Sequence, residues 1–265
     1  MTKGYWQIPL DADSQDKTCF LTSQGSFCFL KMPFGLVNAT ATFNRMVRKL
    51  LKDLDCCESF VDDILCHTPS WKHHLGELRK LFQRIRDAKL TVRPTKCQIG
   101  FRNLNFLGNN VGEGSMKPEE NKLLDILSVP VPETKKQVCS FLGFIGYYSK
   151  YIPNFSAISA PLSDLTRKGK PNKVQWQEPQ DRAFRTLKEL LSKRPILRLP
   201  DFSKPFVVQC DASDTGIGAV LKQEFEDGIF PVEYASKKLT DAEKNYAVIE
   251  KECLSLVWAI KKFAP

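Results

Sequence analysis

Two adjacent aspartates, Asp62 and Asp63, lie between two short apolar runs, and this stretch constrains the fold more than any other. Phe60-Val61 precedes the acids and Ile64-Leu65 follows them, which predicts two strands meeting at a tight turn with the acids at its tip. Two carboxylates held this close repel each other unless a cation lies between them, so a divalent metal is their natural partner. Asp is also a good turn former, and a plain hairpin turn explains the same residues. These residues alone leave both interpretations open.

The composition is that of a soluble globular protein with a basic surface. Of the 265 residues, 42% are hydrophobic and 26% are charged. The net charge of +9 favours a polyanionic partner, and nucleic acid is favoured over an anionic membrane. No apolar run approaches the ~20 residues that span a bilayer, and the first residues lack the hydrophobic region of a signal peptide. We therefore expect no membrane partner and an intracellular location, in the cytoplasm or the nucleus.

The nine cysteines are scattered along the chain without paired spacing. This spacing argues against a cysteine metal knuckle, and we expect most of them to be small buried side chains in a reducing compartment. The three histidines, at positions 67, 73 and 74, are not accompanied by a set of cysteines or carboxylates, so a solvated helix start explains them better than a metal site.

The first part of the chain predicts strands and a loop. Residues 4–10 are rich in aromatic side chains and resemble a strand, and residues 18–22 and 26–30 predict two strands joined by a turn at 23–25. Residues 32–36, Met-Pro-Phe-Gly-Leu, form a loop with Pro and Gly breakers.

Helices alternate with hairpins after this loop. Residues 39–54 predict a helix that Asn38 can cap, with Phe43, Met46, Val47, Leu50 and Leu51 at helical spacing. The hairpin with the two aspartates follows, and residues 71–89 predict a long helix. Residues 106–112 predict another hairpin, with its turn near Asn109-Asn110.

The second half is first helical and then changes to strands. The predicted helices cover residues 117–128, 134–151 (capped by Thr134) and 180–193, the strands cover 206–211, 219–222 and 231–236, and a last helix covers 242–263. We expect the last helix to face inward with Val248, Ile249, Leu256, Val257 and Ile260. Three strands and one helix make a poor core, so this last region looks incomplete.

Six motifs in order resemble one known family over nearly the whole chain. They are Gly4-Tyr5-Trp6-Gln7-Ile8, residues 32–43, Phe60-Val61-Asp62-Asp63, Phe106-Leu107-Gly108, Phe141-Leu142-Gly143 and Asp211-Ala212-Ser213. The chain resembles the reverse transcriptase and ribonuclease H region of a gypsy-type LTR retrotransposon polyprotein. The resemblance implies an α+β fold with three parts. These are a polymerase palm with an antiparallel sheet and helices (1–115), a helical thumb or connection (116–200), and an incomplete ribonuclease H-like α/β domain (201–265).

The resemblance also assigns polymerase roles to particular residues. Asp62 and Asp63 become two of the three palm carboxylates that hold Mg²⁺, with Mn²⁺ as an alternative ion, for two-metal nucleotidyl transfer. Tyr5 matches the residue beneath the incoming sugar, and Phe34 and Gly35 match the loop against nucleotide and template. Phe106, Leu107 and Gly108 match the primer grip, although plain packing also explains this hairpin.

In the last region, the resemblance implies two ribonuclease H carboxylates, Asp211 and Glu252, which would also be metal ligands. Glu252 is preferred to Glu250, which faces elsewhere on the helix, and Asp214 is interpreted as a turn residue. The implied partners are an RNA or DNA template with a DNA primer, an RNA–DNA hybrid and a dNTP. The resemblance gives no oligomeric state.

The chain departs from the family pattern at both ends. The first palm carboxylate would precede Met1, most of the fingers region is absent, and the two later ribonuclease H carboxylates are missing. Loss of one ligand from a site that acts as a unit costs several powers of ten in rate. We therefore expect these residues alone to be catalytically incompetent. A non-catalytic nucleic-acid-binding remnant of a retroelement is the alternative, and an unstable relic is a third.

Overall fold

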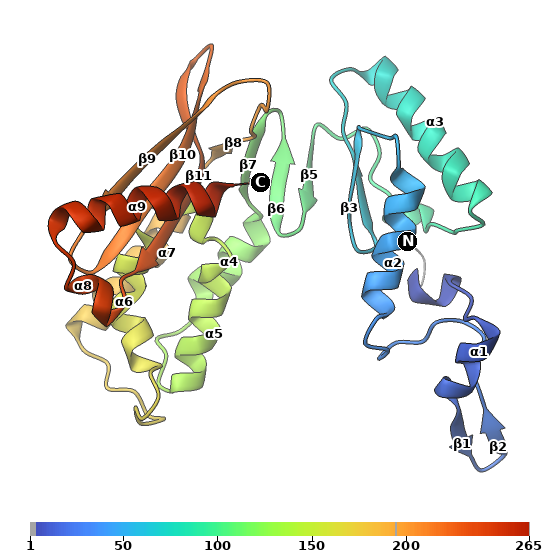
Figure 1. Cartoon of the computed structure of the whole chain (residues 1–265), viewed down its shortest axis with the longest axis horizontal. Coiled ribbons are helices and arrows are strands. Elements are labelled where there is room, and N and C mark those ends of the chain that lie inside the picture. The colour runs from blue at the N-terminus through green and yellow to red at the C-terminus, as the bar shows by residue number, and fades with distance from the viewer. Residues whose placement is uncertain (1–3, 194, 265) are drawn as a thin grey trace. The chain divides into compact units, whose positions relative to one another are not determined.

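The computed structural model describes residues 4–193 and 195–264, which form two compact units, one ending at Phe101 and the other beginning at Arg102 (Figure 1). The fold is α+β, as the sequence predicts. The first unit contains η1 (Gly4–Gln7), α1 (Ala12–Gln15), η2 (Asp16–Thr18), β1 (Phe20–Thr22), β2 (Gly25–Phe27), α2 (Ala39–Leu51), β3 (Cys57–Phe60), β4 (Asp63–Cys66), α3 (Trp71–Asp87) and η3 (Pro94–Lys96). Its strands form two antiparallel hairpins, β1–β2 and β3–β4.

Helices α2 and α3 supply most of the core of this unit. Phe43 and Val47 of α2 are fully buried, and Leu81 and Ile85 of α3 pack in the same cluster. These residues recur at helical spacing, so each helix buries one apolar stripe. Both predicted helices are confirmed, with α2 ending three residues earlier than predicted. Asn38 occupies the N-cap position of α2, but its side chain makes no cap hydrogen bond.

The strand predicted for residues 4–10 is wrong, because this segment begins with the 3₁₀ turn η1. A Cβ added to Gly4 would lie 3.2 Å from two atoms of the Phe43 ring, so the backbone lies directly on that ring. The turn then packs the ring of Tyr5 edge-on against Phe43, with ring centroids 5.5 Å apart. Burial of an aromatic side chain against the core outweighs the local preference for an extended chain.

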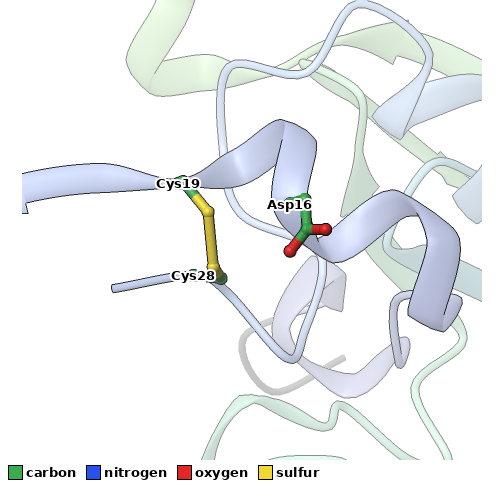
Figure 2. Close-up of side chains that lie close together, drawn as sticks. All are labelled: Asp16, Cys19 and Cys28. Carbon is green, nitrogen blue, oxygen red and sulfur yellow. A yellow bond between two sulfur atoms is a disulfide. The ribbon is translucent and has the colours of Figure 1, made fainter. Parts of the chain in front are cut away.

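Two of the cysteines, Cys19 and Cys28, form a disulfide that closes the β1–β2 hairpin (Figure 2). Phe20 pairs with Phe27 in the ladder, so the next residue outward on each strand is a cysteine. The expectation that most cysteines are buried is also wrong, since Cys57 alone is buried among the free cysteines of the described chain.

The second unit contains two sheets and a group of helices. Its elements are β5 (Asn103–Phe106), β6 (Asn109–Gly112), β7 (Ser115–Pro118), α4 (Glu120–Ser128), α5 (Lys135–Gly146), η4 (Ser149–Tyr151), α6 (Phe155–Leu165), α7 (Glu178–Ser192), β8 (Leu197–Arg198), β9 (Phe206–Ala212), β10 (Gly216–Phe225), β11 (Gly228–Lys238), α8 (Asp241–Lys244) and α9 (Val248–Phe263). One sheet has the order β5-β6-β7-β8 and the other β11-β10-β9, and all of these pairs are antiparallel.

Helices α4 to α7 share one core with strand β8. Fully buried side chains come from each element: Ile126, Ile145, Leu162, Leu187 and Leu197. The predicted Thr134 cap is confirmed, because the Thr134 hydroxyl accepts from the amide of Gln137 and the Gln137 side chain accepts from the Thr134 amide. No described helix is both long and apolar enough to cross a membrane.

The hairpin predicted for residues 106–112 exists, but its turn lies at Leu107-Gly108 and not at Asn109-Asn110. Phe106 pairs with Asn109, and both residues between them have left-handed backbone angles, with φ of 48° and 67°. A two-residue turn with two positive φ angles matches the right-handed twist of the flanking strands, and glycine adopts such an angle without steric cost.

The last helix is divided into α8 and α9, and α9 is rotated relative to the prediction. Helix α9 lies against β9 and β10 (Figure 1). Its buried residues are Lys251, Ser255 and Ala259. The residues expected to face inward are exposed instead: Val248, Ile249, Leu256, Val257 and Ile260. Small side chains let the helix lie close to the sheet, and this contact outweighs the amphipathic pattern.

Candidate active site

The two predicted palm carboxylates lie at the end of the β3–β4 hairpin. Phe60 pairs with Asp63, so the turn consists of Val61 and Asp62, and Asp63 is the first residue of β4. Both aspartates are exposed. The plain-turn interpretation and the metal-site interpretation both require this placement, so the hairpin itself is confirmed.

Val61 has a backbone conformation that β-branched residues rarely adopt. Its φ is 51°, while Asp62 has an ordinary negative φ, which is the pattern of a type II′ turn. Glycine is the usual residue at the first central position of this turn, and a β-branched side chain there costs about 1–3 kcal/mol. Strain of this kind is concentrated at functional sites, so the Val61 angle favours a specific role for the aspartates beside it.

Residues from three separate segments meet beside this turn. A Cβ added to Gly4 would lie 3.9 Å from the Cβ of Asp62, so η1 lies next to the turn. Tyr5 follows Gly4, and its ring lies 5.4 Å from that of Phe34, measured between centroids. The Tyr5 hydroxyl is 2.8 Å from the hydroxyl of Thr40 on α2. The structure therefore brings Asp62, Tyr5 and Phe34 into one neighbourhood, as the sequence motifs imply.

The loop at Phe34-Gly35 is accessible to a ligand. Phe34 is 68% exposed although its ring contacts Tyr5, and Gly35 has a φ of 92° that favours glycine. No described atom lies within 4 Å of a Cβ built on Gly35. An exposed ring beside a backbone without a side chain can accept the flat face of a base.

The predicted primer-grip residues form the closed end of the β5–β6 hairpin in the second unit. The turn carbonyls of Leu107 and Gly108 accept hydrogen bonds from the hydroxyls of Tyr147 and Tyr148. These tyrosines follow the hairpin by 40 residues, and no local pattern around the hairpin connects them to it.

The second acidic pair is placed on a strand and on the neighbouring helix. Asp211 is exposed near the end of β9, and Glu252 is exposed at the fifth residue of α9, which packs on β9. Glu250 has a different role, because its carboxylate accepts from the backbone amide of Ala247 at 2.8 Å and caps the helix. This supports the choice of Glu252 over Glu250.

A buried lysine ties the start of α9 to the loop after β9. Lys251 Nζ lies 2.9 Å from Asp214 Oδ1, and the hydrogen bond from Lys251 holds the pKa of the Asp214 carboxyl below its usual value. Asp214, which is predicted as a turn residue, therefore also holds the start of the helix that carries Glu252 through its ion pair with Lys251.

The donor chemistry at Asp62 and Asp63 suits a hard divalent cation. Two adjacent exposed carboxylates offer only oxygen ligands, which Mg²⁺ and Mn²⁺ prefer. Within the described ranges, the only cluster of three potential ligand atoms is Asp16 with Cys19 and Cys28 (Figure 2). The sulfur atoms of that cluster are bonded to each other, so they offer no thiolates to a metal.

Comparisons with known proteins agree with this arrangement of motifs. Residues 1–145 match the family "Reverse transcriptase (RNA-dependent DNA polymerase)", and residues 176–265 match "RNase H-like domain found in reverse transcriptase". Among curated relatives, the Pol polyprotein of transposon 297 of Drosophila melanogaster is 40% identical over 265 residues, covering 99% of this chain and 25% of the relative. The polyprotein of transposon gypsy of the same organism is 34% identical, covering 99% of this chain and 26% of its own length.

Solved structures agree as well. The foamy viral protease-reverse transcriptase in complex with double-stranded DNA, in its dRH form, has a TM-score of 0.90 and 27% identity, covering 99% of this chain and 46% of that protein. The foamy viral enzyme in complex with an RNA/DNA hybrid has a TM-score of 0.88 and the same identity, covering 99% and 36%. The chain thus spans about a quarter of the curated relatives it matches. It belongs to the reverse transcriptase family and carries the RNase H-like region found in retrotransposon Pol polyproteins.

Proposed function

We propose that this chain supplies palm carboxylates, a nucleotide-contacting loop and a primer-grip hairpin for RNA-directed DNA synthesis, together with part of a ribonuclease H site. The observation that supports this most is the strained turn that presents Asp62 beside Gly4, next to Tyr5 and Phe34. We propose the corresponding division into palm (1–115), thumb or connection (116–200) and ribonuclease H-like region (201–265).

In the palm, Asp62 and Asp63 would hold Mg²⁺, with Mn²⁺ as the alternative. The bound ions would lower the pKa of the primer 3′ hydroxyl and neutralise charge on the leaving pyrophosphate. The Tyr5 ring packs edge-on against the buried Phe43 ring, and its hydroxyl lies 2.8 Å from the hydroxyl of Thr40. These two contacts would hold the ring in place against the sugar of the incoming dNTP. A ring fixed in this way would exclude a 2′ hydroxyl by contact.

The loop and the hairpin would position the two strands of the substrate. Phe34 and Gly35 would lie against the nucleotide and the template base, and Phe106, Leu107 and Gly108 would hold the end of the primer. The basic surface, with a net charge of +9, would attract the phosphates of a primer–template duplex or an RNA–DNA hybrid. In the last region, Asp211 and Glu252 would hold metal ions at the phosphate to be cleaved.

Duplex binding without chemistry is a second candidate function, and the net positive charge favours it. The two candidates differ in the role of the aspartates. In a pure binding protein they would be turn residues, and their carboxylates would repel the phosphates of the ligand.

Mn²⁺ binding to the 265-residue chain tests the proposal without requiring activity. The double substitution Asp62→Asn, Asp63→Asn should abolish the strongest Mn²⁺ site measured by electron paramagnetic resonance. The matched control is Asp53→Asn, Asp55→Asn, which removes two exposed carboxylates from the loop before the same hairpin and should leave that site intact. Asp53 has a φ of 63°, an angle that asparagine tolerates, so the control should fold normally.

Primer extension and duplex affinity are then measured on the same proteins. Any extension by the parent chain must disappear in the Asp62→Asn, Asp63→Asn variant. Equal Mn²⁺ binding by all three proteins would refute the metal-site assignment. If duplex also bound more tightly to the double Asn variant and no protein extended a primer, the non-catalytic binding function would be favoured.

A further inference from the structure

Three tyrosine hydroxyls converge on the turn of the β5–β6 hairpin. Tyr147 donates to the Leu107 carbonyl and Tyr148 to the Gly108 carbonyl, the latter at 3.0 Å. Tyr151 donates to Asn109 Oδ1 at 2.8 Å. Each residue of the segment 107–109 therefore accepts a hydrogen bond from a different tyrosine.

The same turn atoms are also connected to one another and to the start of α4. Asn109 Nδ2 donates to the Leu107 carbonyl at 2.7 Å, and the Glu119 amide donates to the Gly108 carbonyl at 3.0 Å. The antiparallel ladder ends at Phe106 and Asn109, so these carbonyls lie beyond the last pair of the hairpin. Interactions from outside the hairpin thus fix the position of its turn.

The tyrosines are held by the helical core of the second unit. Tyr148 and Tyr151 are each 2% exposed, whereas Tyr147 is 52% exposed at the end of α5. Burial raises the pKa of Tyr148 to about 12 and also raises that of Tyr151, so both hydroxyls stay protonated and can donate at neutral pH. Asn109 is itself buried.

The contact leaves little room at the turn. A Cβ added to Gly108 would lie 3.3 Å from the Tyr148 hydroxyl oxygen and 3.5 Å from the Tyr147 ring. Gly108 therefore serves both the left-handed backbone angle and the close approach of the tyrosines.

We infer that Tyr147, Tyr148 and Tyr151 are positioning residues that fix the turn of the primer-grip hairpin on the helical core. This inference rests on the proposed function, because it takes residues 106–108 as the contact for the end of the primer. The tyrosine hydrogen bonds have a mechanical consequence for the hairpin. The turn and helix α5 move as one body, so the position of the primer end follows the position of the helices and not the flexibility of a free hairpin.

A purely structural role for the tyrosines would have a different signature. If the role were purely structural, removal of the hydroxyls would lower the melting temperature of the protein, but the end of a bound primer would be held as before. The test therefore needs a local probe at the primer end as well as a measure of stability.

The variant Tyr148→Phe, Tyr151→Phe removes two hydroxyls and keeps both rings. The matched control is Tyr234→Phe, which removes the hydroxyl of a partly buried tyrosine on β11. The 265-residue proteins are bound to a primer–template whose primer carries the fluorescent base 2-aminopurine, either at the 3′ end or several bases inside the duplex.

We expect the double variant to show several-fold higher fluorescence at the 3′ end, as the terminal base unstacks, and no change at the internal position. Duplex affinity should change by less than about threefold, because phosphate contacts carry most of it. The Tyr234→Phe control should match the parent chain in both measurements. Should the double variant not fold, Tyr147→Phe at the half-exposed position should give the same change with smaller amplitude.

Two other results would be decisive. Normal duplex binding with an unchanged 3′-end signal in the Tyr148→Phe, Tyr151→Phe and Tyr147→Phe variants would overturn the inference while leaving the proposed function intact. Absence of duplex binding by the parent chain would overturn the proposed function and this inference together.

Discussion

The strained angle at Val61 predicts an inverted order of stability for two simple substitutions. At an ordinary position, replacement by glycine destabilises a protein by about 0.5–1 kcal/mol more than replacement by alanine. At Val61, with φ of 51°, any Cβ is penalised by roughly 1–2 kcal/mol and glycine is not. We therefore expect Val61→Gly to be more stable than Val61→Ala by about 1 kcal/mol. The comparison cancels the packing lost with the half-buried Val61 side chain, because both variants lose it.

Urea unfolding and thermal melting of the two variants measure this difference. For a unit the size of residues 4–101, about 1 kcal/mol corresponds to ~4–8 °C in melting temperature. The control pair is Ile64→Ala and Ile64→Gly, on β4 of the same hairpin and in the same cluster, where the ordinary order should hold. Equal stability of the Val61 variants, or greater stability of Val61→Ala, would refute the argument from strain. If the strain serves the aspartates, Val61→Gly should also bind Mn²⁺ more weakly than the parent chain.

Three further outcomes follow from particular contacts. Lys188 donates hydrogen bonds to the last carbonyls of α4, so Lys188→Met should lower the free energy of unfolding by about 1–3 kcal/mol in urea titrations. The control Lys193→Met loses only an exposed ion pair and should change the free energy of unfolding little. Hydrogen bonds from Lys237 and the Thr240 amide lower the pKa of Glu243 from 4.5 to about 2. The contribution of Glu243 to the free energy of unfolding is therefore fully present above pH 4.5 and is lost as the pH falls to about 2. The stability difference between the parent chain and Glu243→Gln should vanish over that range, and a constant difference would contradict the assignment. Duplex affinity should fall by about tenfold or more between ~50 and ~200 mM salt if several phosphates are contacted, and fluorescence anisotropy that is insensitive to salt would argue against a basic binding surface.

Local patterns predicted those parts of the fold that local residues determine. The helix at Phe43 and Val47 follows from its apolar spacing, and the hairpin at Asp62 follows from acids between apolar runs. The disulfide between Cys19 and Cys28 could also have been predicted, because the two cysteines lie on facing predicted strands at nearly the same distance from the turn, and the observed register places them opposite each other.

Contacts between distant segments explain what local patterns missed. The turn at Leu107-Gly108 is stabilised by tyrosines from α5 and η4, which no local signal around the hairpin reveals. The 3₁₀ turn at Tyr5 depends on the Phe43 ring, from a helix more than thirty residues away. The strain at Val61 has no sequence signal at all, because valine is among the residues least expected at a positive φ.

The rotated helix α9 affects how the protein behaves in concentrated solution. Its exposed side presents apolar residues such as Val248, Ile249 and Ile260 to water, while the net charge of +9 keeps separate molecules apart by repulsion. Salt shortens the range of that repulsion to about 10 Å at 0.1 M. The ionic strength that weakens binding to phosphates will therefore also promote association of the chains, and polar residues on this side of α9 would separate the two effects.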